Sequence, residues 1–318
     1  MDPAHAAHGI VTIDTGFQRP RFDAAYLIVE NGRAAFVDCG TRHALPALFA
    51  ALEAQGLGAE AVDWVILTHV HLDHAGGAGA LMRELPHARL LVHPRGAAHM
   101  VDPARLVAGA TAVYGEAEMA RSYGEVVPVP AARVYEAPDG TVVELAGRPL
   151  LCADTPGHAR HHLCVWDARS RSWFTGDTFG LSYRELDDAQ GRPFAIPTTS
   201  PVQFEPEPLK ASIRALCARE PDAMYLTHYG RIGDAARVGA ELIEQVDAMV
   251  ALARAARDRP DRHAWLVEAL AALYAECAAA HGSRAGAAGV RAALAIDIEL
   301  NAQGLEVWLD REAKRTGG

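Results

Sequence analysis

Hydrophobic and polar positions divide the chain into two regions of different periodicity. Up to about residue 232, short apolar runs predict β-strands, and segments with helical spacing lie between them. Residues 24–30 and 34–40 flank an Asn-Gly turn and predict a β-hairpin, whereas residues 43–56 have the spacing of a helix that ends on glycine. Further strands are predicted at 62–69, 88–94, 141–145, 148–158, 161–167, 171–177 and 222–228.

The region from residue 233 to residue 318 lacks this strand pattern. It is rich in alanine, its apolar positions have helical spacing, and the sequence RDRPDRH at 257–263 predicts a turn between two helices. We therefore expect an α/β domain at 1–232 and a C-terminal helical region at 233–318. Apolar positions on more than one side of these helices favour burial, which would cap a pocket, form a homodimer interface, or do both.

Several predicted strands end in side chains that bind metals or carry protons. His69, His158, Asp177 and His228 each stand at the end of a predicted strand. Functional side chains of layered α/β proteins gather on the loops beyond strand ends. These four strand ends therefore predict one shared site.

The densest group of such residues lies in VILTHVHLDHAGG, at 65–77. It contains His69, His71, Asp73 and His74 within six positions. Residues two apart in an extended segment point the same way, so His69 and His71 are expected to bind one metal ion together. Asp73 and His74 fall where the strand gives way to two glycines and can turn toward a second metal ion. Imidazole and carboxylate ligands suit zinc, and they also suit iron and manganese.

Composition narrows the classes of partner. The net charge is −10 and no basic stripe is present, which argues against nucleic acid. No apolar run reaches the roughly 18 residues of a membrane span, and the N-terminal residues lack the pattern of a signal peptide. The five cysteines form no CxxC pair and indicate free thiols in a reducing compartment. We therefore expect a cytoplasmic protein with a small-molecule substrate.

The order and spacing of these motifs resemble the metallo-β-lactamase superfamily of metallohydrolases. HxHxDH follows a buried strand, and TPGH, FTGD and YLTH then follow in that order, over a region from about residue 10 to residue 232. The resemblance implies an α/β fold of the four-layer αβ/βα sandwich type, here with a C-terminal helical extension. The helical extension of this chain is similar in layout to that of glyoxalase II-like enzymes and of PqsE-like thioesterases.

The resemblance also implies a ligand set for two divalent metal ions, of which zinc is favoured. One metal ion would be held by His69, His71 and His158. The other would be held by Asp73, His74 and His228, and Asp177 would bridge the two. Asp38, in the sequence FVDCG, would orient a ligand. Two cations close together can share one hydroxide and make it a nucleophile at neutral pH.

The implied chemistry is hydrolysis of a small thioester or lactone, in which the bridging hydroxide attacks the carbonyl. Asp177 stands where the cysteine-bearing β-lactamases have cysteine, which disfavours antibiotic hydrolysis. Asp73 is expected to be essential, and Tyr229 is a candidate to hydrogen-bond a developing oxyanion.

The long segment 179–210 follows Asp177 and is a candidate lid. Its aromatic residues Phe179, Tyr183 and Phe204 are candidates to line a substrate pocket, and packing within the domain is the alternative.

Two other functions fit the same residues. A single iron ion on His69, His71 or His158 together with Asp177 would suit an oxidoreductase similar to persulfide dioxygenases. Alternatively, the metal core would be a scaffold, and the helical region would bind a partner protein as a regulator.

Overall fold

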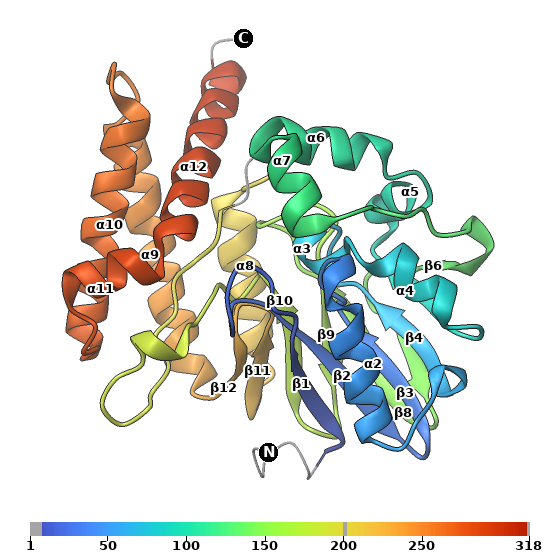
Figure 1. Cartoon of the computed structure of the whole chain (residues 1–318). Coiled ribbons are helices and arrows are strands. Elements are labelled where there is room, and N and C mark those ends of the chain that lie inside the picture. The colour runs from blue at the N-terminus through green and yellow to red at the C-terminus, as the bar shows by residue number, and fades with distance from the viewer. Residues whose placement is uncertain (1–7, 200–201, 317–318) are drawn as a thin grey trace. The chain divides into compact units, whose positions relative to one another are not determined.

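The structure is a computed structural model that describes residues 8–199 and 202–316 (Figure 1). Its strands are β1 (Ile10–Asp14), β2 (Ala24–Glu30), β3 (Arg33–Val37), β4 (Val62–Ile66), β5 (Arg89–Val92), β6 (Val134–Glu136), β7 (Val142–Leu145), β8 (Arg148–Asp154), β9 (Leu163–Asp167), β10 (Ser172–Gly176), β11 (Ala223–Leu226) and β12 (Gly230–Ile232). Its α-helices are α2 (Leu45–Ala54), α3 (Leu72–Ala75), α4 (Ala78–Glu84), α5 (Pro94–Val101), α6 (Ala104–Tyr114), α7 (Glu116–Glu118), α8 (Pro206–Cys217), α9 (Ala235–Ala255), α10 (Arg262–His281), α11 (Gly286–Ala293) and α12 (Ala295–Thr316). Shorter helical turns are η1 (Arg42–Ala44), η2 (Ala59–Ala61), η3 (Met119–Tyr123), η4 (Ala131–Arg133) and η5 (Arg184–Leu186).

The chain divides into two compact units, which are described separately. The first comprises residues 1–154, 161–176 and 224–231, and the second comprises residues 155–160, 177–223 and 232–318. The predicted domain boundary after residue 232 remains a prediction.

The first sheet of the first unit has the order β1-β2-β3-β4-β5-β6. β1, β2 and β3 pair antiparallel, and the predicted hairpin is β2 with β3. β3, β4, β5 and β6 pair parallel, so these four strands end at the same edge. Loops that follow adjacent parallel strands therefore meet there, which is the arrangement that gathers side chains into a site.

The second sheet has the order β12-β11-β10-β9-β8-β7, and β7 to β10 pair antiparallel. The first sheet contacts it through Tyr26, whose ring packs against Phe174 and Tyr225 at centroid distances of 5.3 and 5.2 Å. The Tyr26 hydroxyl donates to the carbonyl of Leu226. The two sheets of this unit thus share an aromatic layer.

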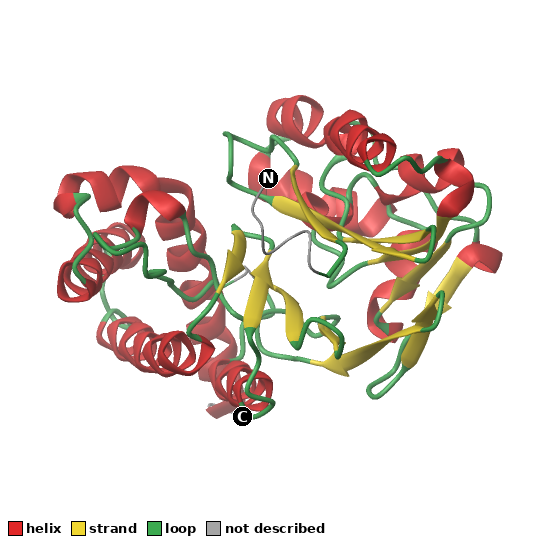
Figure 2. Cartoon of the chain, turned by 90° about the horizontal axis from the view of Figure 1, so that it is seen from below, coloured by secondary structure: helices red, strands yellow, loops and turns green. Residues whose placement is uncertain are grey.

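Helices cover the outer face of the first sheet, as Figure 2 shows. Leu48 of α2, Leu81 of α4 and Met100 of α5 are buried in one cluster with Phe36 and Leu90 of the sheet. Burial of such side chains supplies the main driving force for folding of this layer. α2 confirms the helix that the apolar spacing at 43–56 predicts, whereas the sequence analysis did not predict α5 and α6.

The second unit contains α8 to α12, so the expected C-terminal helices are confirmed. The predicted break at 257–263 covers most of the connection between α9 and α10 and the first two residues of α10. Leu242, Leu270 and Leu305 of these helices are fully buried, which fits their apolar positions on more than one side. None of the helices in the described ranges combines the length and the apolar character needed to cross a membrane. A homodimer through α9 to α12 stays a prediction.

Candidate metal centre

The edge where the parallel strands end carries a buried carboxylate, Asp38, directly after β3. Its backbone N–H donates to the carbonyl of Ile66 on β4. The carboxylate accepts hydrogen bonds from the backbone N–H of Thr68 at 2.8 Å and from the hydroxyls of Thr68 and Thr227 at 2.9 Å. These donors compensate the loss of hydration that a buried charge suffers.

His69 and His71 come together in the loop between β4 and α3. Nε2 of His69 and Nδ1 of His71 are 2.8 Å apart, and the ring planes meet at 78°. His71 has extended backbone, with φ −62° and ψ 148°. The geometry of these two imidazoles therefore agrees with the expectation that both face one metal position.

Asp73, His74 and His228 form a second group in the same unit. One ligand atom of each lies within 4.8 Å of those of the other two. Oδ2 of Asp73 is 3.6 Å from Nε2 of His74 and 3.6 Å from Nε2 of His228. α3 presents Asp73 and His74, whereas His228 follows β11. Three donor atoms thus converge from two distant parts of the sequence.

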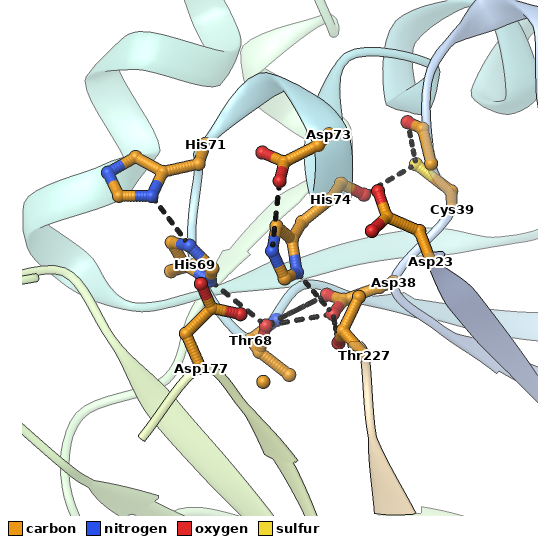
Figure 3. A network of polar contacts seen from close by, with 12 residues as sticks. Asp23, Asp38, Cys39, Thr68, His69, His71, Asp73, His74, Asp177 and Thr227 are labelled. Atoms are coloured by element: carbon orange, nitrogen blue, oxygen red, sulfur yellow. Dashed lines mark hydrogen bonds and ion pairs between the residues drawn. The ribbon is translucent and has the colours of Figure 1, made fainter. Parts of the chain in front are cut away.

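Each histidine of this group has its other ring nitrogen against a buried carboxylate. Nδ1 of His74 bonds Oδ2 of Asp38 at 2.9 Å, as Figure 3 shows. Nδ1 of His228 lies 2.6 Å from Oδ1 of Asp23. A carboxylate at Nδ1 fixes the tautomer and turns Nε2 toward a metal ion, which is the usual arrangement behind metal-binding histidines. The donor chemistry of this group therefore fits a divalent metal ion.

Asp23 is absent from the residues that the sequence analysis singled out. It is completely buried at the start of β2, and the adjacent residue Ala24 donates its N–H to the carbonyl of Thr227. Burial raises the pKa of the Asp23 carboxyl to about 6, and the neighbouring His228 acts in the opposite direction. A charged residue next to the apolar run of β2 is its only signal in the sequence, and such residues usually face solvent.

Two glycines in this unit allow close approach of backbone. A Cβ atom on Gly77, which follows α3, would lie 2.7 Å from the carbonyl oxygen of Thr41. A Cβ atom on Gly176, at the end of β10, would lie 2.6 Å from Nε2 of His162 and from Oγ1 of Thr68. Gly77 therefore meets a steric requirement of the fold.

His161 and His162 pack beside the first pair of histidines. The ring of His162 is fully buried and stacks on that of His69 with a centroid distance of 4.8 Å. The ring of His161 stands perpendicular to that of His71 at 5.5 Å. These are packing contacts between rings.

The second unit holds the other two predicted ligands. Nε2 of His158 is 3.3 Å from Oδ2 of Asp177, and both side chains are buried. Nδ1 of His158 bonds the hydroxyl of Thr198 at 2.8 Å. Nε2 of His158 thus faces a carboxylate oxygen of Asp177, and the other ring nitrogen is held by a hydroxyl. This is the same kind of arrangement as for the histidines of the first unit.

The predicted pocket residues of the 179–210 segment are also in the second unit, and all three are buried. The hydroxyl of Tyr183 donates to Asp297 of α12, and the ring of Phe204 packs edge-on against Trp308 of the same helix. Phe179 lies beside Gly239 of α9. These contacts are those of packing, and a role of Phe179, Tyr183 and Phe204 in substrate binding stays a prediction. Tyr229 is partly buried, and its catalytic role also stays a prediction.

A cavity of about 490 Å³ opens in the first unit between the β1–β2 loop and the turn η3. It is lined by Thr15, Gly16, Phe17, Gln18, Thr41, His43, Arg121 and Ser122. Phe17 packs against Phe22, whose ring meets that of His228 edge-on at 5.7 Å. Gln18 donates to Glu118 of α7 at 3.2 Å, which joins the two walls. One aromatic residue therefore connects the cavity wall to the candidate metal ligands.

Comparison with known proteins decides the family. Residues 19–228, more than half of the chain, match the family described as Metallo-beta-lactamase superfamily. The chain belongs to the metallo-beta-lactamase superfamily. This membership, together with the two sheets and their helices, confirms the predicted fold class.

Relatives in the superfamily include named hydrolases. An atrochrysone carboxyl ACP thioesterase of Aspergillus fumigatus is 30% identical over 117 residues, which cover 37% of this chain and 27% of the relative. A hydroxyacylglutathione hydrolase of Aeromonas hydrophila subsp. hydrophila is 26% identical over 214 residues, which cover 64% of this chain and 69% of the relative. The chain thus spans about a quarter of the first of these relatives.

A solved structure of the superfamily supports the fold over nearly the whole chain. It is a metallo-beta-lactamase family protein from Thermus thermophilus, with a TM-score of 0.67 and 21% identity. The match covers 96% of this chain and 94% of that one. At this identity the likeness concerns the fold alone.

Proposed function

We propose that the protein is a dinuclear metal-dependent hydrolase that cleaves a small thioester. The convergence of Asp73, His74 and His228, with both histidines backed by buried carboxylates, carries this proposal. Two divalent cations, when bound, would lower the pKa of water enough to supply hydroxide at neutral pH. Names of relatives that describe thioesterases and hydroxyacylglutathione hydrolases favour a thioester over a lactone.

The proposal combines the ligand candidates of both units. His69, His71 and His158 would hold one cation, whereas Asp73, His74 and His228 would hold the other, and Asp177 would bind both. Asp177 is bonded directly to Gly176, and Gly176 packs against Thr68 of the first unit. Since consecutive Cα atoms are about 3.8 Å apart, this connection supports the assignment of Asp177.

The chain's own side chains would prepare the reaction. Asp38 and Asp23 would favour a proton on Nδ1 of His74 and of His228, which would leave both Nε2 atoms available to a metal ion. Tyr229 would donate a hydrogen bond to the oxygen that becomes negative as the carbonyl is attacked.

The cavity of the first unit would hold part of the substrate. Its lining contains an amide, hydroxyls, an imidazole and a guanidinium from Gln18, Thr41, His43 and Arg121. These groups donate hydrogen bonds, which suits an acyl or thiol portion that carries carbonyl or carboxylate oxygens.

Metal analysis joined to a substrate panel tests the proposal. Protein prepared without added metal is expected to bind two divalent ions per chain and to hydrolyse thioesters faster than lactones. A single iron ion with oxygen uptake on a persulfide would instead support the dioxygenase alternative. Two bound metal ions without turnover of any ester would support the regulatory alternative.

A further inference from the structure

The segment Phe194–Thr199, here called the strap, crosses the second unit between η5 and α8. Phe194, Ala195, Ile196 and Thr199 are at most 2% exposed. Ile196 exchanges two backbone hydrogen bonds of 3.0 Å with Leu181. The strap belongs to the 179–210 segment, a candidate lid from its sequence, and is buried and hydrogen-bonded.

Helices of the C-terminal region hold the strap by side-chain amides. Gln245 of α9 donates to the carbonyl of Ala195 at 2.9 Å. Asn301 of α12 donates to the carbonyl of Pro197 at 3.0 Å and accepts from the N–H of Thr199 at 2.6 Å. The side-chain amide of Asn301 therefore forms hydrogen bonds with the peptide groups on both sides of Thr198.

α12 has a further adaptation to the strap at Gly304. A Cβ atom there would lie 2.5 Å from the hydroxyl oxygen of Thr199 and 2.6 Å from its carbonyl oxygen. The Thr199 hydroxyl in turn donates to the carbonyl of Asn301 at 2.9 Å. Backbone of strap and helix thus pack directly against each other, which leaves the strap little freedom to shift.

Thr198 lies between these two peptide groups. Its hydroxyl forms a hydrogen bond of 2.8 Å with Nδ1 of His158. The backbone around His158 is fixed separately, because the carbonyl of Gly157 accepts from Glu205 N–H at 2.8 Å and that of Pro156 accepts from the Ser212 hydroxyl. The hydrogen bond from Thr198 to Nδ1 therefore restrains the imidazole, whose Nε2 faces Asp177.

We propose that Asn301 is a positioning residue for the metal centre, which acts on His158 through the strap and Thr198. The C-terminal helical region would then help to build the centre, in addition to any role as a cap or an interface. The inference rests on the proposed function, because it requires His158 to be a metal ligand.

The test measures the affinity of the two metal ions separately, with cobalt as the spectroscopic probe and competition against a chelator. Thr198→Val removes the hydroxyl at similar volume and is expected to weaken one of the two ions about 10- to 100-fold, and Thr198→Ser to restore it. Asn301→Leu is expected to weaken the same ion about 10-fold. Thr111→Val, at a hydroxyl that bonds Val107 on α6, is the matched control and leaves both ions unchanged.

Three outcomes decide the matter. Loss confined to one ion in both the Thr198 and the Asn301 variants supports the proposal. Unchanged affinity in Thr198→Val, or equal loss of both ions, overturns it. If Asn301→Leu does not fold, Asn301→Asp replaces it, because it keeps the acceptor for Thr199 and loses the donor to Pro197.

His158→Ala separates this inference from the proposed function. If His158→Ala binds both ions as well as the wild type does, the ligand assignment itself fails. If His158→Ala loses one ion and Thr198→Val loses none, the assignment stands and the inference about the strap fails.

Discussion

His74 and His228 of the first unit are held by different means from His158 of the second unit. In the first unit, the buried carboxylates Asp38 and Asp23 lie behind His74 and His228. In the second unit, the neutral hydroxyl of Thr198 lies behind His158. A carboxylate strengthens an imidazole as a ligand and adds negative charge near the cation, whereas a hydroxyl mainly fixes the ring.

The surroundings of these groups explain the difference. Asp38 sits where β3 and β4 end side by side, so backbone and hydroxyl donors are available to satisfy a buried charge. The strap of the second unit forms an isolated β-bridge with Leu181 and is held by amides from α9 and α12. A sheet edge can stabilise a buried anion, and a helix-bound strap can place a neutral donor or acceptor.

The largest expected effect tests whether the first unit supplies an indispensable ligand. In Asp73→Asn, the oxygen between the two Nε2 atoms loses its negative charge, and thioester turnover is expected to fall by about 10³-fold or more. Steady-state kinetics and a thermal melt measure this. Asp63→Asn, at the surface pair with Arg33, is the control, and full activity of Asp73→Asn would contradict the mechanism.

A buried carboxylate away from the ligands tests whether such groups in the first unit serve stability or the centre. Burial alone would raise the pKa of Asp167, but hydrogen bonds from Arg148 and Ser170 outweigh it and lower that pKa below its usual value. Asp167→Asn is expected to lower the free energy of unfolding at pH 7 by about 3–5 kcal/mol and to leave metal content unchanged.

The pH dependence of this effect has a defined sign. Because the folded-state pKa of Asp167 is lowered, its contribution is present above the unfolded pKa of about 4 and is lost as pH falls through the folded value. Denaturant unfolding of wild type and Asp167→Asn should therefore differ at pH 7, and the difference should shrink as pH falls from about 4 toward the folded-state pKa. If Asp167→Asn also lost metal, Asp167 would not differ from the carboxylates that lie behind the candidate metal ligands.

Asp23→Asn sharpens the comparison between the carboxylates and the hydroxyl. It keeps an oxygen near Nδ1 of His228 and removes the charge, so one metal ion is expected to bind about 100-fold more weakly. Competition with a chelator should show that this is the ion left intact in Thr198→Val. If both variants weaken the same ion, the proposed division of ligands is wrong.

The smallest expected effect concerns the cavity. Gln18→Ala removes a cavity-lining amide, and KM for a thioester is expected to rise about fivefold with kcat unchanged, since one such hydrogen bond contributes about 1 kcal/mol. Gln303→Ala is the matched control, because Gln303 makes a similar bond to Glu299 on α12. Equal KM values in wild type and Gln18→Ala would place the substrate elsewhere.

Much of the fold follows from local patterns. The hairpin of β2 and β3 lies where alternating apolar residues flank Asn-Gly, and α2 lies where apolar residues have helical spacing. α6 has no buried residue among its eleven, so it lacks the pattern from which a helix is inferred.

The sequence by itself determined which residues are able to bind metal, because HxHxDH concentrates imidazole and carboxylate groups at one strand end. Only the tertiary structure decided which residues orient these imidazole and carboxylate groups. Asp23 lies 205 positions from His228 (228 − 23), and Asn301 lies 103 positions from Thr198 (301 − 198). Such pairs meet only when the sheets and helices pack, and no local periodicity relates them.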